Sequence, residues 1–196
     1  MVSPGPVVAP RLDAVPRSAA QTRILDAALD LIGEHGVSGT SLQMIANSVG
    51  VTKAAVYHKF KSKDEIVIAV TERELAKLQD ALDAAEAEKQ HSRARLLLLA
   101  AVIDMAVERR RWVSTLQHDP VIVRLLAEHQ PFQDFLNRLY AVLLGEDVGP
   151  RARVLAAILS AALAGAVINP LVADMDNDEL RTELLLVTQR LLHVPD

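Results

Sequence analysis

Side chains that can bind a polyanion are concentrated in one short stretch of this 196-residue chain, residues 51–65. The stretch holds four of the six lysines and two of the six aromatic residues, although the whole protein carries a net charge of -4. Lysine, tyrosine and histidine side chains can all donate hydrogen bonds to phosphate oxygens. The chemistry they offer here is phosphate binding by Lys53, Tyr57, His58, Lys59, Lys61 and Lys63.

The charge of the chain is divided unevenly along its length. Residues 1–63 carry seven basic and four acidic side chains, a balance of +3, so the remaining residues carry fourteen and twenty-one, a balance of -7. Opposite charges in the two parts predict that the first part meets a polyanion and that the second has another task.

Other kinds of chemistry find little support in the sequence. The six histidines are scattered, cysteine is absent, and we find no nucleophile–base arrangement and no glycine-rich phosphate loop. We therefore expect no enzyme activity, no metal and no cofactor. No apolar run is long enough for a membrane span and the N-terminus does not resemble a signal peptide, so we expect a soluble, cytoplasmic protein.

The pattern of helix signals predicts an all-α fold with about nine helices. Residues 1–16 contain four prolines and are expected to form a flexible tail. Three S/T-x-x-E/Q capping boxes then open apolar-periodic runs, at Ser18–Gln21, Thr40–Gln43 and Ser62–Glu65. They predict a first helix that stops near Gly36 and Gly39, a second over residues 41–48, and a long fourth helix over 63–88. A short third helix, residues 53–59, is capped by Thr52.

The second part of the chain is expected to be helical as well. The central run 92–112 is apolar on most sides and predicts one buried helix. Shorter helices are expected at 120–128 and 131–144. Two more are expected at 150–168, ended or kinked by Pro170, and at 178–193, capped by Asp176.

The second and third helices together have the features of a helix-turn-helix. Ala46 is small where the two helices approach, Gly50 tolerates the positive φ of the turn, and Val56 ties the second helix to the first. In such a motif the second helix lies in the DNA major groove. The position of the lysines is therefore explained if this short motif binds DNA, because their charge offsets the acidity of the rest of the chain.

From Thr22 to Ile66 the sequence TRILDAALDLIGEHGVSGTSLQMIANSVGVTKAAVYHKFKSKDEI resembles, without a gap, the N-terminal domain of the tetracycline-repressor (TetR) family of bacterial transcription regulators. The resemblance includes the Tyr-x-x-Phe-x-x-Lys run at Tyr57, Phe60 and Lys63. It implies a DNA-binding domain at 17–62 and a helical ligand-binding and dimerisation domain at 63–196. The chain departs from the family pattern at Ala54, where glycine is frequent, and at Lys59, where histidine or tyrosine is common.

Carried over by position, the resemblance implies DNA contacts at the start of the second helix, along the third, and at the start of the fourth. Phe60 is more simply a core residue, and Lys61 a solvated charge. Tyr57 can also be a packing residue and His58 a solvated one. The implied contacts are Ser41, Leu42, Gln43, Thr52, Lys53, Ala54, Ala55, Tyr57, His58, Lys59 and Lys63.

An effector pocket is expected among the middle helices, lined mainly by apolar side chains. The same residues can equally form ordinary core. Asp104 interrupts the most apolar helix, where it can orient a polar ligand or belong to a solvated charged stripe with its neighbours Arg93, Glu108 and Arg111. The candidates are Val102, Asp104, Met105, Trp112, Leu116, Phe132, Phe135, Leu136 and Tyr140.

The last two helices have broad apolar faces, more than one subunit can bury at its edge. We therefore expect a four-helix interface in a two-fold homodimer. The alternative is a monomer that folds both faces inward. The expected interface residues are Leu155, Ile158, Leu159, Ala162, Gly165, Leu180, Leu184, Val187 and Leu191.

The sequence thus predicts a homodimeric, ligand-responsive transcriptional regulator, expected to be a repressor that binds a near-palindromic operator and leaves it when a small, mainly apolar effector binds. Two other classes stay open. One is an architectural DNA-binding protein without an effector, and the other is a helical carrier of hydrophobic molecules.

Overall fold

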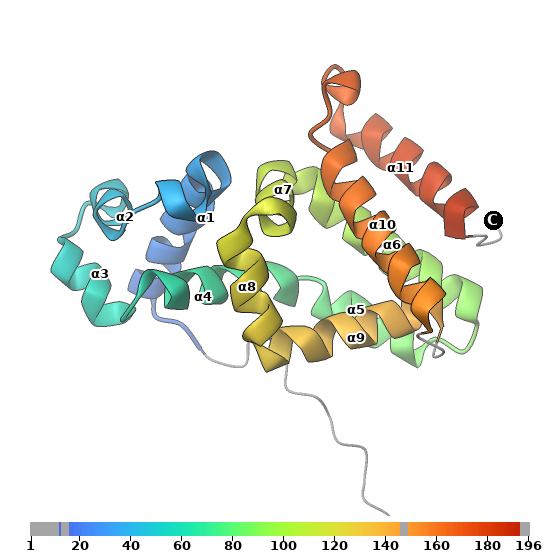
Figure 1. The fold of residues 1–196 in the computed structure, drawn as a ribbon, viewed down its shortest axis with the longest axis horizontal. Helices are drawn as coiled ribbons and strands as arrows, with labels where there is room; N and C mark the ends of the chain where they lie inside the picture. Colours follow the sequence, from blue (N-terminus) through green and yellow to red (C-terminus); the bar gives the residue numbers. More distant parts are fainter. Residues whose placement is uncertain (1–11, 13–15, 146–148, 193–196) are drawn as a thin grey trace, which may run out of the picture.

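The computed structural model describes residue 12, residues 16–145 and residues 149–192. Over these residues the protein is all-α, with eleven α-helices, one short 3-10 helix and no strand (Figure 1). The predicted tail and the predicted helix end at His193 lie mostly outside the described residues. Leu12 is an exception within the tail, because it is described and is buried in the core.

The first three helices form a small head. They are α1 (Ala19–Gly39), α2 (Leu42–Val49) and α3 (Lys53–Lys59). Ser18 and Gln21 make the complete capping box that the sequence predicts. α1 bends at Gly36, whose φ of 70° suits glycine.

The other two predicted capping boxes differ from the expectation. α2 is capped by Ser41, whose hydroxyl accepts from the Met44 N–H, while the Thr40 hydroxyl instead donates to carbonyls at the end of α1. Ser62 caps α4 as predicted, but the Glu65 carboxylate accepts from the Lys61 N–H and not from Ser62. Local spacing therefore located both helix starts to within a residue, but it gave the wrong cap for α2 and the wrong partner for Glu65.

The long helix predicted over residues 63–88 is divided into α4 (Lys63–Ala76) and α5 (Gln79–Ala87). The Leu78 N–H bonds to the Leu75 carbonyl at 2.9 Å, a tighter turn than an α-helix makes. Leu75, Leu78 and Leu82 are all buried around this turn. Packing of apolar side chains on both sides of the bend, and not a glycine or proline, therefore ends α4.

The single helix predicted over residues 92–112 is also divided, into α6 (His91–Glu108) and α7 (Arg110–His118). Arg109 leaves the helical conformation with φ of -118° and ψ of 35°. The bend buries Trp112 and Val113 and brings α7 against α1 and α10.

The remaining helices are α8 (Pro120–Glu128), α9 (Gln130–Leu144), α10 (Pro150–Ala166), the 3-10 helix η1 (Pro170–Val172) and α11 (Asn177–Leu192). α10 ends before Pro170, and the Asp176 carboxylate caps α11 as predicted, accepting from the Asp178 and Glu179 N–H groups at 2.9 Å. Figure 1 shows α4 leading from the head into a larger helical body, with α10 and α11 both on the far side from α3.

Candidate nucleic-acid interface and ligand cavity

The turn between α2 and α3 has the geometry of a helix-turn-helix. Gly50 adopts a left-handed conformation with φ of 75°, and the Val51 N–H returns to the Ala46 carbonyl at 2.9 Å. A Cβ at Gly50 would meet nothing within 4 Å, so the backbone angle and not space calls for glycine here. Ala46 and Val56 are fully buried and hold the two helices together.

α3 has an exposed surface that packing within the protein does not explain. Of its seven residues only Val56 is buried, and Tyr57 is 54% exposed despite its aromatic ring. Phe60, at the C-terminal end, is 1% exposed and belongs to the core, as expected. The side chains left facing outward are Lys53, Ala54, Ala55, Tyr57, His58 and Lys59.

The starts of α2 and α3 lie next to this surface. Ser41 and Gln43 are exposed, whereas Leu42 is half-buried and packs against the core. The hydroxyls of Ser41 and Thr52 cap their helices, with Thr52 Oγ1 accepting from the Ala55 N–H at 3.1 Å. A helix N-terminus with its remaining free N–H groups favours a phosphate.

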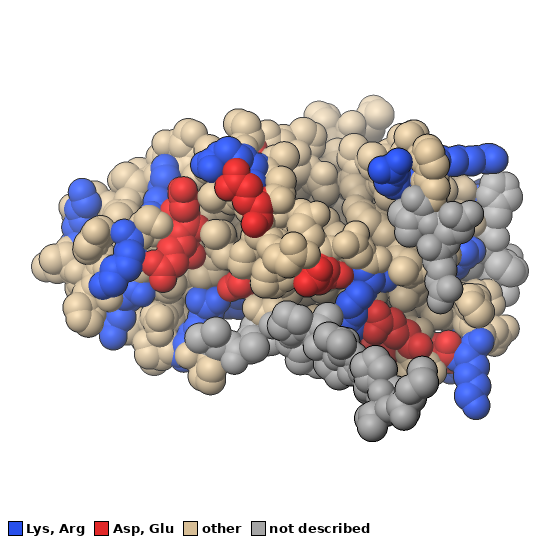
Figure 2. All heavy atoms as spheres, turned by 60° about the horizontal axis from the view of Figure 1, so that its bottom comes forward, with Lys and Arg blue, Asp and Glu red and all other residues tan. Residues whose placement is uncertain are grey.

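The lysines of this region differ in their surroundings. The Lys61 ammonium lies 6.0 Å from the centre of the Tyr57 ring. The Lys63 ammonium donates to the carbonyls of Val37 at 2.7 Å and Thr40 at 3.1 Å, so it also binds the C-terminal end of α1. On the face drawn in Figure 2, Lys and Arg side chains gather at the end of the molecule that the head forms.

The body contains a cavity of about 460 Å³ that is lined by residues of α4 and α6–α11 and by Leu78 between α4 and α5. Most of its lining is apolar and includes seven of the nine residues that the sequence predicts for the pocket. Exposed lining residues at Gln117, Val123 and Ala127 mark an opening on the α7–α8 side. The predicted residues in the lining are Val102, Met105, Leu116, Phe132, Phe135, Leu136 and Tyr140.

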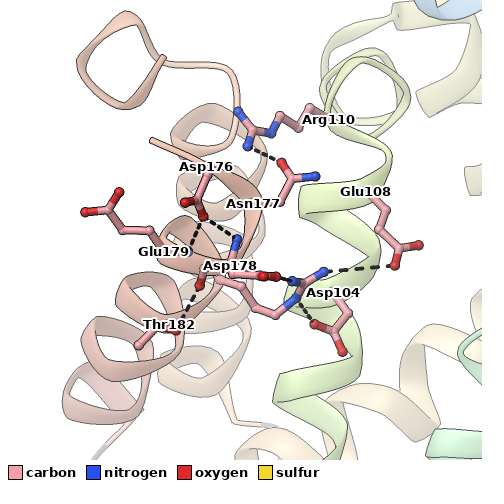
Figure 3. A network of polar contacts seen from close by, with 9 residues as sticks. Asp104, Glu108, Arg110, Asp176, Asn177, Asp178, Glu179 and Thr182 are labelled. Carbon is pink, nitrogen blue, oxygen red and sulfur yellow. Dashed lines mark hydrogen bonds and ion pairs between the residues drawn. The ribbon is translucent and has the colours of Figure 1, made fainter. Parts of the chain in front are cut away.

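The other two predicted pocket residues lie elsewhere. Asp104 faces α11, where it forms an ion pair with Arg181, which also binds Asp178 (Figure 3). Trp112 is buried at the bend between α6 and α7 but is not among the cavity-lining residues. Asp104 thus joins two helices on the protein surface and does not reach the cavity.

Besides Gln117 at the opening, three polar lining residues were not predicted from the sequence: Gln133, Ser160 and Thr188. Each interrupts a helix that is otherwise apolar on that side, and this interruption is the signal that identifies them in retrospect. The Ser160 hydroxyl lies 2.9 Å from the Tyr140 hydroxyl, which joins α10 to α9.

α10 and α11 leave large apolar side chains exposed. Ile158 is 58%, Val187 51% and Leu191 56% exposed, and all three belong to the predicted interface. Leu180 does not lie on this face, because it is 2% exposed in the core of its own subunit. Leu155, Leu159, Gly165 and Leu184 are half-buried, and Ala162 is exposed. Val154 and Leu186 extend the exposed face and were not predicted.

Two further properties concern the described residues as a whole. Among residues 12, 16–145 and 149–192, no group of three or more His, Cys, Asp or Glu side chains is arranged to hold a metal ion. None of the helices in these ranges is long and apolar enough to cross a membrane.

Residues 24–70 match the family model described as bacterial regulatory proteins, tetR family. The chain is 45% identical over 58 residues to the HTH-type transcriptional regulator AcrR of Shigella flexneri. This aligned stretch covers 29% of this chain and 27% of that protein. The chain is 34% identical over 58 residues to the HTH-type transcriptional repressor KstR2 of Rhodococcus jostii, covering 30% and 28%. These aligned regions therefore span less than a third of either relative, and both relatives are transcriptional regulators and not enzymes.

The fold of the whole chain is similar to that of solved regulators. A TetR-like transcriptional regulator from Rhodococcus sp. RHA1 superposes with a TM-score of 0.67 at 22% identity, covering 92% of this chain and all of that one. The regulator FadR from Bacillus subtilis, solved in complex with stearoyl-CoA, gives a TM-score of 0.63 at 18% identity, covering 87% and 96%. At these identities the likeness concerns the fold alone.

Proposed function

We propose that this chain, whose residues 24–70 match the model of the tetR family of bacterial regulatory proteins, is a member of that family and acts as a ligand-responsive, DNA-binding transcriptional regulator. Residues 17–62 are the DNA-binding domain and residues 63–196 the ligand-binding and dimerisation domain. As a regulator of bacterial genes it acts in the cytoplasm, where the DNA is.

The observation that carries the proposal is the surface of α3. A seven-residue helix is too short to be stable alone, and this one buries a single side chain, Val56. Its outward positions carry lysine, tyrosine and histidine, which suit phosphates and base edges. The head holds α3 in place through Val56, and the exposed side of α3 can therefore lie in a DNA major groove.

The regulator is a homodimer that binds a near-palindromic operator as a repressor. The exposed apolar faces of α10 and α11 support a two-fold interface, because burying them against a second copy removes Ile158, Val187 and Leu191 from water. Two heads held in this way place their α3 helices in successive major grooves.

The effector is a small, mainly apolar molecule that binds the cavity of the body and releases the operator. A cavity of about 460 Å³ lies within the range of small-molecule sites. Leu75 and Leu78 line it at the junction of α4 and α5, so an occupant touches the helix that joins the head. Release follows if the effector binds better to the arrangement that does not fit DNA.

Selection of bound duplexes from random DNA at near-physiological salt, followed by sequencing, tests the proposal. We expect an inverted repeat. Recovery of shapeless AT-rich sequence, with strong salt dependence, would indicate an architectural DNA-binding protein. Recovery of no DNA from a protein that binds hydrophobic molecules would indicate a carrier. Either of these two results contradicts the proposed regulator.

A further inference from the structure

The hydroxyl groups that line the cavity have their hydrogens committed within the protein, whereas the Gln133 amide has only one of its two hydrogens committed. The Ser160 hydroxyl donates to the Ala156 carbonyl at 2.8 Å, and the Thr188 hydroxyl donates to the Leu184 carbonyl at 2.6 Å. The Gln133 side-chain amide donates one of its two hydrogens to the Leu126 carbonyl at 2.8 Å. The oxygens of these three side chains still have lone pairs that can accept.

The hydroxyl of Tyr140 is committed in the same way. It lies 2.9 Å from Ser160 Oγ, and either oxygen is chemically able to donate. A backbone carbonyl carries no hydrogen, so the single hydroxyl hydrogen of Ser160 is used by its bond to Ala156. Tyr140 must therefore be the donor to Ser160, and its own oxygen remains an acceptor.

The cavity lining contains no Asp, Glu, Lys, Arg or His among the described residues. A carboxylate or ammonium group moved into such surroundings loses its hydration and gains no opposite charge. Ionised ligands are therefore disfavoured by the same wall that accommodates an apolar chain.

These two properties together define a class of ligand. We propose that the cavity binds an uncharged hydrophobic molecule that carries a hydrogen-bond donor, such as an alcohol or phenol hydroxyl, and that the Tyr140–Ser160 pair selects it over the ketone and the carboxylate of the same skeleton. The inference rests on the proposed function, because it names the class of effector that the regulator responds to.

The preference follows from counting donors and acceptors. A ligand hydroxyl donates to the Tyr140 oxygen and can accept the remaining amide hydrogen of Gln133. A ketone can accept the same amide hydrogen of Gln133, but it has no hydrogen to donate to the Tyr140 oxygen, so it makes one hydrogen bond fewer than the alcohol. A polar site that loses its hydrogen-bond partner in this way rejects the analogue that lacks it.

Binding to the full-length protein without DNA tests the inference, by calorimetry with 1-decanol, 2-decanone and decanoate at pH 7.5. We expect 1-decanol to bind about tenfold more tightly than 2-decanone, the worth of one hydrogen bond, and decanoate to bind more weakly still. Equal or tighter binding of the ketone or of decanoate, or no binding of 1-decanol, would overturn the proposal.

The Ser160→Ala variant makes the test specific to the hydrogen-bond state. Removing the Ser160 oxygen frees the Tyr140 hydroxyl hydrogen to point into the cavity, so 2-decanone should gain and the tenfold preference should shrink to about one. Thr182→Ala is the control. It removes an exposed hydroxyl that lies outside the cavity and donates to a carbonyl of its own helix, so the preference for 1-decanol over 2-decanone should stay unchanged. An unchanged preference in Ser160→Ala would refute the assigned donor direction.

Operator binding is measured separately on the same protein. If the duplex selection fails but the alcohol preference holds, the proposed regulator is wrong and the ligand class stands. If an operator is found but the preference is absent, the regulator stands and the ligand class is wrong. The two failures are therefore distinguishable.

Discussion

At the scale of single residues, the lysines around α3 have different roles although they are close in sequence. Lys59 is exposed at the end of α3, while the Lys63 ammonium is hydrogen-bonded to two carbonyls at the end of α1. A cation at a helix C-terminus stabilises the helix dipole as well as the carbonyls it binds. We therefore expect Lys59 to serve DNA binding alone and Lys63 to serve both DNA binding and the fold.

The variant Lys59→Ala should weaken DNA binding on operator and random duplexes alike. If Lys59 neutralises one phosphate, the slope of log K against log salt concentration should fall in magnitude by about one. Titration by fluorescence anisotropy at several salt concentrations measures the slope. Lys89→Ala, an exposed lysine between α5 and α6, is the matched control and should leave it unchanged. If the salt slope of Lys59→Ala equals that of the wild type, Lys59 does not neutralise a DNA phosphate.

The variant Lys63→Ala should lower both DNA affinity and stability. Its two hydrogen bonds to the end of α1 are lost, and we expect a cost of about 1 kcal/mol in the free energy of unfolding. Denaturant unfolding measures the loss, with Lys59→Ala as the comparison that should unfold like the wild type. If both variants were equally stable, the bonds of Lys63 to Val37 and Thr40 would contribute nothing measurable.

At the scale of helices, Asp119 joins the head to the body. One carboxylate oxygen accepts from the Val37 N–H at 2.8 Å, beside the bend of α1, and the other accepts from the Val121 N–H at 2.9 Å as the cap of α8. A cap that also binds a second helix restrains both. This contact positions the end of α1 relative to the body and hence the proposed DNA-binding surface relative to the cavity.

We expect Asp119→Ala to cost more than an ordinary cap. Loss of a helix cap costs about 1 kcal/mol, and the unpaired Val37 N–H adds roughly as much again. Asp176→Ala is the control. The Asp176 carboxylate caps α11 by accepting from two N–H groups, and both of these groups belong to α11 itself. The free energies of unfolding of the two variants should differ. Equal losses would mean that the bond to Val37 does not stabilise the protein.

Helix starts were predictable from the sequence because capping is local, as Ser18, Ser62 and Asp176 show. The helix ends at Lys77 and Arg109 were not, because no glycine or proline marks them and the bends arise from packing between distant helices. The core role of Phe60, which the sequence analysis expected as the simpler interpretation, is confirmed by its 1% exposure. The ion pair of Asp104 with Arg181 joins residues 77 positions apart and has no local signature.

At the scale of the whole molecule, the exposed face of α10 and α11 should hold two copies together. Val187→Glu places a charge where an apolar contact is expected and should shift the protein from dimer to monomer in sedimentation velocity. Leu97→Glu is the matched control, since Leu97 is 44% exposed on α6, outside this face. A wild type that sediments as a monomer, or a Val187→Glu variant that stays dimeric, would contradict the proposed interface.

A buried carboxylate connects the head, α4 and the bend between α6 and α7. Glu74 is 1% exposed and pairs with Arg73 at 3.2 Å, with Arg109 at 3.3 Å and with Lys77. Arg73 in turn binds Asp26 of α1 at 2.8 Å. Because Leu75 lines the ligand cavity next to Glu74 in the chain, this cluster lies on the physical path between cavity and head.

The variant Glu74→Gln removes the anion that Arg73, Lys77 and Arg109 share, although Arg73 keeps its pair with Asp26. We expect it to cost about 2 kcal/mol in the free energy of unfolding, below the usual penalty for a broken buried pair because the cations are partly exposed to water. Glu72→Gln is the matched control on the same helix, since Glu72 pairs with Arg17 and His129 but is 21% exposed, and it should cost less than 1 kcal/mol. Similar losses in the two variants would show that burial of Glu74 does not strengthen its ion pairs. A larger loss for Glu74→Gln, together with faster amide hydrogen exchange at the end of α4, would identify this cluster as part of the connection between the two domains.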